Sequence, residues 1–125
     1  MSEDLEVTVT SVDGVRLLGV RGEFDADEAE ALARPLAAPF DGTVLGVVVD
    51  LSRVTFADSS FLHTLIEAHR RHLAADVPFV LAEPHPTVRR LLDLTDTARF
   101  FTVAPTTTAA LEQVRGARRD GHHVR

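Results

Sequence analysis

Apolar and polar residues alternate over positions 5–10, and a second segment that favours a strand follows over positions 15–22. This alternation is typical of β-strands that bury one face against a core. Asp13-Gly14 lies between the two segments, and this residue pair favours the tight turn of a β-hairpin. The chain is therefore predicted to begin with two antiparallel strands.

A near-continuous apolar run over residues 44–49 predicts a strand that is buried on both faces, as in sheets with parallel pairing. We expect this strand to end in a turn. A shorter apolar stretch around Val54 then leads directly into Asp58-Ser59-Ser60. Residues 60–74 carry apolar side chains at helical spacing, so the three polar residues are predicted to open a helix.

The remaining elements follow from the same kinds of pattern. They are a helix after Asp25 with Glu28 in capping-box position and an end or bend near Pro35, a strand over 78–82, a helix over 86–94, a strand over 100–103 and a helix over 105–114. The predicted order is β-β-α-β-α-β-α-β-α. Strands that alternate with helices indicate an α/β fold in which helices pack on one central sheet.

Length and composition fit a single domain, because 125 residues with 45% hydrophobic content suffice for one buried core. The sequence becomes basic and poor in apolar residues after Gly116. We therefore expect a domain over residues 1–116 and a basic, disordered tail over residues 117–125.

The charge and residue content exclude several classes of function. The net charge is −6, and an acidic surface is unsuited to direct nucleic-acid binding. The sequence has no apolar run of about 18 residues, so no membrane span is expected. Cysteine is absent, which excludes disulfides, thiol catalysis and thiolate metal sites. The acidic start lacks the features of a signal peptide, so we expect a cytoplasmic protein.

Asp58-Ser59-Ser60 is the main candidate for chemistry, and three interpretations compete for it. The residues can simply cap the helix, since Asp and Ser are favoured at helix starts. Ser59 can act as a nucleophile with His63, four residues on, although no Gly-x-Ser-x-Gly segment surrounds it. Ser59 can also accept a phosphoryl group, because a helix N-terminus tolerates negative charge. The added charge beside Asp58 would then repel a partner without unfolding the helix.

Three segments of the chain resemble a known family. Residues 50–62 look like the signature of STAS domains, the family of bacterial anti-sigma factor antagonists. Gly22-Glu23-Phe24-Asp25 resembles the family's Gly-Glu-hydrophobic-Asp motif, and residues 86–95 resemble its third-helix segment. The order and spacing of the three match over roughly residues 5–114.

The resemblance implies a small α/β fold with a central mixed β-sheet and helices mainly on one side. It implies that the unphosphorylated protein binds an anti-sigma factor, itself a serine kinase, and thereby releases a sigma factor. Ser59 corresponds to the phosphorylated serine, and a phosphatase would reverse the modification. Asp25, Asp58, Ser60 and the start of the following helix, including Phe61, would line the docking face. ATP would belong to the kinase, so no cofactor and no catalysis are expected for this chain.

Phe61 departs from the family pattern, which usually has glycine directly after Asp-Ser-Ser. If the phenylalanine side chain turns inward it joins the core, and docking survives. If it points outward it blocks a kinase or supplies a new apolar contact. Phe61 also motivates an alternative function as an adaptor that is not phosphorylated, in a signalling assembly or a transporter complex.

The histidines of the second predicted helix raise the question of a metal site. His63, His69 and His72 lie near Glu67, but their spacing does not bring them to one face of the helix. We interpret them as surface or core-edge residues, and we expect no metal site.

Overall fold

The computed structural model describes residues 5–37, 42 and 44–123. Five strands form one sheet in the order of the sequence: β1 Glu6–Val12, β2 Val15–Glu23, β3 Gly46–Phe56, β4 Phe79–Ala82 and β5 Thr102–Ala104. The α-helices are α1 Ala29–Leu36, α2 Ser59–Ala74, α3 Pro86–Leu94 and α4 Thr107–His123, and the 3-10 helices are η1 Ala26–Glu28 and η2 Ala98–Phe100. β1 and β2 pair antiparallel and all other neighbours pair parallel, which confirms the predicted mixed sheet.

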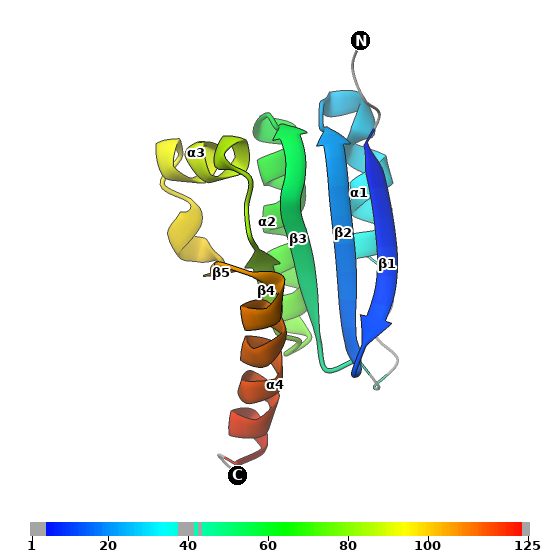
Figure 1. Ribbon diagram of the computed structural model, residues 1–125, viewed down its shortest axis with the longest axis vertical. Helices are drawn as coiled ribbons and strands as arrows, with labels where there is room; N and C mark the ends of the chain where they lie inside the picture. Colours follow the sequence, from blue (N-terminus) through cyan, green and yellow to red (C-terminus); the bar gives the residue numbers. More distant parts are fainter. Residues whose placement is uncertain (1–4, 38–41, 43, 124–125) are drawn as a thin grey trace.

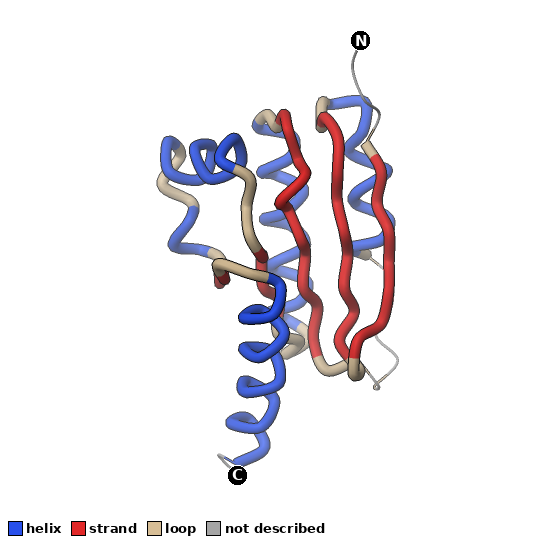
Figure 2. The backbone as a smooth tube through the Cα atoms, in the orientation of Figure 1, coloured by secondary structure: helices blue, strands red, loops and turns tan. Residues whose placement is uncertain are grey.

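The helices divide unequally between the two faces of the sheet. Helices α1 and α2 lie behind the sheet in Figure 1, and buried residues of α3 join the same core cluster. Right-handed crossovers between successive parallel strands place the intervening helices on one face. Figure 2 shows α4 running along the opposite face, where no further strand has to follow it. The prediction of helices mainly on one side is therefore confirmed.

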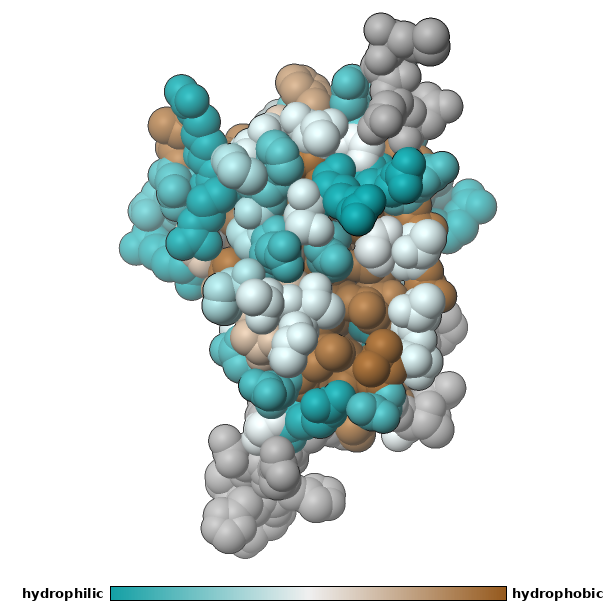
Figure 3. Space-filling view, in the orientation of Figure 1, coloured by the Kyte–Doolittle hydropathy of each residue, from teal (hydrophilic) through white to brown (hydrophobic). Residues whose placement is uncertain are grey.

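β3 is buried on both faces of the sheet, as is the short strand β4. Val47, Val49 and Leu51 pack into the large core under α1, α2 and α3, whereas Val48 packs into the smaller core under α4. All four side chains are at most 1% exposed, so the predicted burial of this strand on both faces is confirmed. The smaller core is less complete: Figure 3 shows an apolar patch beside α4, and the nearby Leu17 and Leu45 are only partly buried.

β3 is longer than the sequence predicts. The expected turn after residue 49 is instead an irregularity within one continuous strand. The side chain of Asp50 accepts a hydrogen bond from the backbone amide of Ser52 at 2.9 Å. This local hydrogen bond takes the place of a backbone hydrogen bond between strands. The register against β2 shifts at this point, from the pair Gly19–Asp50 to the pair Arg21–Arg53. A bulge of this kind bends a strand without ending it.

Helix α4 packs closely against the start of β3. A Cβ atom on Gly46 would collide with the side chain of Val114 and approach the carbonyl oxygen of Pro78. The helical backbone continues past Gly116 to His123, further than the predicted end near Val114. One glycine costs a helix only about 1 kcal/mol, so it does not have to end one. The domain boundary after residue 116 stays a prediction, and residues 124–125 lie outside the described chain.

Other local predictions hold. Asp13 and Gly14 have φ angles of 51° and 85°, as the tight hairpin turn requires. Helix α1 ends at Leu36, one residue after Pro35. Among the described residues, no helix combines the length and apolar character needed to span a membrane.

Two phenylalanines near the end of β3 have opposite environments. Phe61, in the first turn of α2, is fully buried, and its ring meets the edge of Phe24 at a centroid distance of 5.0 Å and an interplanar angle of 69°. Phe56, the last residue of β3, is 48% exposed. Phe61 is therefore part of the core, whereas Phe56 presents apolar surface to solvent.

This difference predicts unequal effects of truncation. Phe61→Ala should lower the free energy of unfolding by about 3–5 kcal/mol, because it removes a buried ring and leaves a cavity. Phe56→Ala is the matched control and should change stability by no more than about 0.5 kcal/mol. Chemical denaturation followed by circular dichroism measures both values. Equal losses for the two variants would contradict the assignment of Phe61 to the core.

His72 of α2 is a buried titratable group. Its ring lies 4.6 Å from the ring of Phe79, and its Nδ1 donates to the carbonyl oxygen of Ala68 at 2.7 Å. Burial lowers the pKa of His72 below the ordinary value of 6.5, and the nearby charges of Arg71, Arg16 and His69 act in the same direction. The hydrogen bond to Ala68 partly opposes this shift.

The lowered pKa of His72 predicts that stability falls in acid. Below pH 6.5 the unfolded chain binds a proton at this residue that the folded chain resists, so the free energy of unfolding decreases as the pH falls. Urea denaturation between about pH 5 and pH 8 measures this slope. His72→Leu should flatten the slope. Equal slopes for wild type and His72→Leu would refute the prediction.

Candidate functional site

The junction of β3 and α2 is organised by Asp58. Its extended backbone, with φ −122° and ψ −169°, is that of an N-cap residue. The carboxylate accepts hydrogen bonds from the backbone amides of Ser60 at 3.0 Å and Phe61 at 3.3 Å. The amide of Ser60 would otherwise lack a partner within the helix, whereas that of Phe61 also donates to the carbonyl oxygen of Asp58 at 3.1 Å. Asp58 therefore fixes where the helix begins and makes Ser59 its first residue.

Ser59 is exposed at the first position of α2. Its neighbours hold the backbone in place: Asp58 caps the turn, and Phe61, Leu62 and Leu65 are buried within the core. The hydroxyl is thus displayed to solvent on a firmly packed helix start. Such a group can accept a phosphoryl group without disturbing the core.

Ser60 differs from Ser59 in exposure and role. It is half-buried, its amide is held by Asp58, and its carbonyl oxygen accepts a hydrogen bond from the hydroxyl of Thr64 at 2.9 Å. The structure therefore distinguishes the two serines, with Ser59 the more accessible.

Asp25 lies in the loop that follows β2. It is exposed, and its side chain accepts a hydrogen bond from the amide of Asp27 at 3.0 Å. Its carbonyl oxygen accepts from the amide of Glu28, also at 3.0 Å, so Asp25 caps the short helix η1. The predicted capping box is wrong in this detail: α1 itself begins at Ala29 without a side-chain cap, because the 3-10 turn separates it from Asp25.

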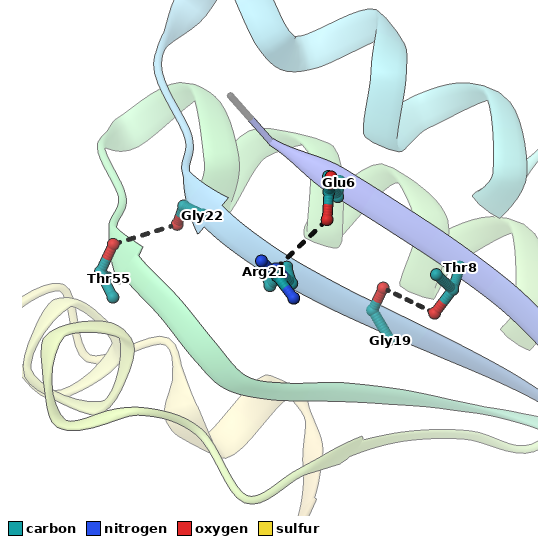
Figure 4. Close-up of polar contacts among 6 residues, drawn as sticks. All are labelled: Glu6, Thr8, Gly19, Arg21, Gly22 and Thr55. Atoms are coloured by element: carbon teal, nitrogen blue, oxygen red, sulfur yellow. Dashed lines mark hydrogen bonds and ion pairs between the residues drawn. The ribbon is translucent and has the colours of Figure 1, made fainter. Parts of the chain in front are cut away.

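Three contacts hold the Asp25 loop beside the Asp58 loop. The amide of Phe24 donates to the carbonyl oxygen of Phe56 at 2.8 Å, and the ring of Phe24 packs on Phe61. The hydroxyl of Thr55 donates to the carbonyl oxygen of Gly22 at 3.3 Å, a contact drawn between β2 and β3 in Figure 4. The two loops therefore share the carboxyl ends of two parallel strands, where sites in α/β sheets usually form.

The structure changes the predicted docking set at two positions. Phe61 is fully buried, so its side chain cannot contact a partner and is removed from the set. Phe56 was not predicted, yet its half-exposed ring lies two residues before Asp58. Strand alternation from the buried Val54 would place Phe56 in the core, so the local pattern alone does not reveal its exposure.

The geometry does not assemble a catalytic or metal site here. His63 is exposed and makes no hydrogen bond with Ser59, so no base is oriented toward the hydroxyl within this described segment. His69 packs against the rings of Phe79 and Phe101, and His72 is buried in the core. No group of three potential metal-ligating side chains occurs in the described parts of the chain.

Comparisons with known proteins agree with one another. Residues 6–110 match the family model of the STAS domain. The chain is 30% identical over 118 residues to the anti-sigma-F factor antagonist RsfB of Mycobacterium tuberculosis, covering 94% of this chain and 96% of RsfB. It is also similar to the crystal structure of an anti-sigma factor antagonist from Mycobacterium paratuberculosis, with a TM-score of 0.82, 31% identity, and coverage of 92% and 99%.

More distant structures share the fold. SpoIIAA in its unphosphorylated form aligns with a TM-score of 0.71 and 24% identity over 90% of this chain and 96% of SpoIIAA. Bacillus SpoIIAA in its phosphorylated form aligns with a TM-score of 0.65 and 22% identity over 88% and 98%. The family match extends from β1 into α4 and includes the whole sheet and the Asp58–Ser59 junction. The chain therefore belongs to the STAS domain family.

Proposed function

We propose that this protein is an anti-sigma factor antagonist that binds its anti-sigma factor while Ser59 is unphosphorylated and releases it after phosphorylation. The observation that carries the proposal is the exposed Ser59 hydroxyl at the capped start of α2, beside the Asp25 loop. The names of the relatives support the same role. The partner would be a serine kinase that supplies ATP, a phosphatase would restore binding, and the chain itself would act as a regulatory binding protein in the cytoplasm.

The proposed docking face combines charge with one apolar ring. Asp25 and Asp58 contribute carboxylates, Ser60 contributes a half-buried polar group, and Phe56 contributes apolar area. Buried aromatic anchors and well-placed charges are the contacts that dominate many protein interfaces. The alternative function as a non-phosphorylated adaptor is motivated by Phe61 in place of the usual glycine, and the burial of the ring removes the case in which its side chain blocks a kinase.

Phosphorylation at Ser59 would change the surface and leave the fold intact. The dipole and free amides at a helix start favour negative charge by about 0.3–1 kcal/mol. The carboxylate of Asp58 already occupies the amides of Ser60 and Phe61, so the new phosphate would project outward beside a like charge. A partner that fits the unmodified surface would then meet both bulk and repulsion.

The first test concerns the phosphorylated residue. Incubation with ATP and the anti-sigma factor kinase of the same organism should place one phosphoryl group on the wild type. Ser59→Ala should abolish this incorporation, and Ser60→Ala should retain it, because Ser59 is exposed and Ser60 is half-buried. Intact-mass and peptide mass spectrometry identify the site. Unchanged incorporation in Ser59→Ala would rule out Ser59.

The second test concerns the effect of charge on binding. Ser59→Asp should weaken binding to the anti-sigma factor by about tenfold or more, because like charges in an interface cost up to several kcal/mol. Ser59→Asn has nearly the same size without the charge, and it should bind more tightly than Ser59→Asp. Isothermal titration calorimetry measures both affinities. If the two variants bind equally, charge at this position does not control the interaction.

A further inference from the structure

The outer edge of β1 is an unpaired strand edge. Within the described chain, β1 pairs only with β2, through seven consecutive residue pairs without a bulge. Lysine, proline and inward-pointing charges, which keep edge strands from pairing with another chain, are absent from this strand. Its one charged residue, Glu6, forms an ion pair with Arg21 of β2 at 3.2 Å (Figure 4). The edge thus offers backbone donors and acceptors over its whole length.

A groove of about 470 Å³ runs beside this edge, between β1 and α1. Its apolar lining comes from Val9, Ala31 and Pro35, and its charged lining from Glu30 and Arg34. Val9 is the central residue of β1 and is 53% exposed, although its pairing partner Leu18 is fully buried. Glu30 and Arg34 form an exposed ion pair at 3.4 Å. Apolar surface and both signs of charge therefore lie along the same edge.

We propose that a second copy of this chain occupies the edge, with the two β1 strands paired antiparallel about a twofold axis at Val9. All seven residues of β1 take part in this register, because Val9 lies at the centre of the strand. Val9 then faces Val9 of the other copy, and the groove of each copy meets the groove of the other. The contact uses the same surface on both copies, as a closed dimer requires.

The spacing of the helices agrees with this pairing. Helix α1 lies over β1 and β2 (Figure 1), so the two α1 helices would be separated by about two strand spacings, roughly 10 Å. Packed helices are usually 8–10 Å apart. The two helices can therefore cover the joined edges without leaving a gap between them.

The charges in the groove favour a second copy over a partner that carries charge of only one sign. An antiparallel arrangement of the two helices brings Arg34 of each copy toward Glu30 of the other. The two Glu6 side chains would lie about 20 Å apart, beyond the screening distance at physiological ionic strength. A strongly acidic or basic segment would match only one of the two charges in the groove. The groove is thus complementary to itself.

The proposed dimer leaves the Ser59 site open. β2 lies between the outer edge of β1 and β3, which leads to Ser59. A variant that blocks the β1 edge should therefore lose dimerisation and retain phosphorylation of Ser59. The test of the dimer can therefore fail while the proposed function at Ser59 holds, and the test of the proposed function can fail while the dimer holds.

The absence of native cysteine allows a direct test by cross-linking. Side chains directly opposite each other in antiparallel strands have Cβ atoms about 4.5–5.5 Å apart, close enough for a disulfide after slight adjustment. Val9→Cys should form a cross-linked dimer under oxidised glutathione, at least tenfold faster than Leu94→Cys. Leu94 is the control because it is 75% exposed and lies on α3, away from β1. Equal rates for the two variants would overturn the proposal.

Sedimentation equilibrium of the full chain supplies the second measurement. The wild type should show a mass of twice 13.6 kDa, and Val9→Lys should show a single chain, while Leu94→Lys stays dimeric. Arg34→Glu should weaken the dimer roughly fivefold, and the exchanged pair Glu30→Arg/Arg34→Glu should restore it. A monomeric wild type at its highest soluble concentration overturns the proposal, as does a dimer that persists in Val9→Lys. If the wild type is monomeric and Val9→Lys no longer binds the anti-sigma factor, the edge belongs to that partner instead.

Discussion

The structure depends on the burial of β3 from both sides. Side chains from alternate positions of this strand enter two separate cores, one under α1, α2 and α3 and one under α4. The strand therefore joins the two helix layers and cannot shift its register without exposing one core. Its C-terminal end leads to the Asp58–Ser59 junction, so the candidate site lies at the end of a strand that is buried on both faces.

The Asp25 loop is held to the same support by a small number of contacts. A backbone hydrogen bond joins Phe24 to Phe56, and the ring of Phe24 packs against Phe61 in the first turn of α2. The polar residues of the two loops thus lie above a buried pair of aromatic rings. Under the proposed function, phosphorylation of Ser59 would therefore act on a partner directly, because the groups around it are tied to the core.

The sequence pattern was sufficient for the fold wherever periodicity and burial coincide. The hairpin, the doubly buried strand, α2 and α3 follow from apolar spacing and capping residues, and Ser59 follows from its position at a helix start. The course of β3 beyond residue 49 was missed, because Asp50 and Ser52 resemble a turn while the surrounding sheet keeps the chain extended. The exposure of Phe56 and the contact of Gly46 with Val114 depend on packing between distant segments, and no local pattern encodes them.

The aromatic pair also has an evolutionary consequence. The family pattern places glycine at the position of Phe61, and a glycine there would leave the ring of Phe24 without its edge-on neighbour. A relative with glycine must fill that volume from another residue, so substitutions at the two positions should occur together. A change beneath the Asp25 and Asp58 loops can in this way alter their spacing while every surface residue is retained, so related STAS domains can differ at this surface through changes in their interiors.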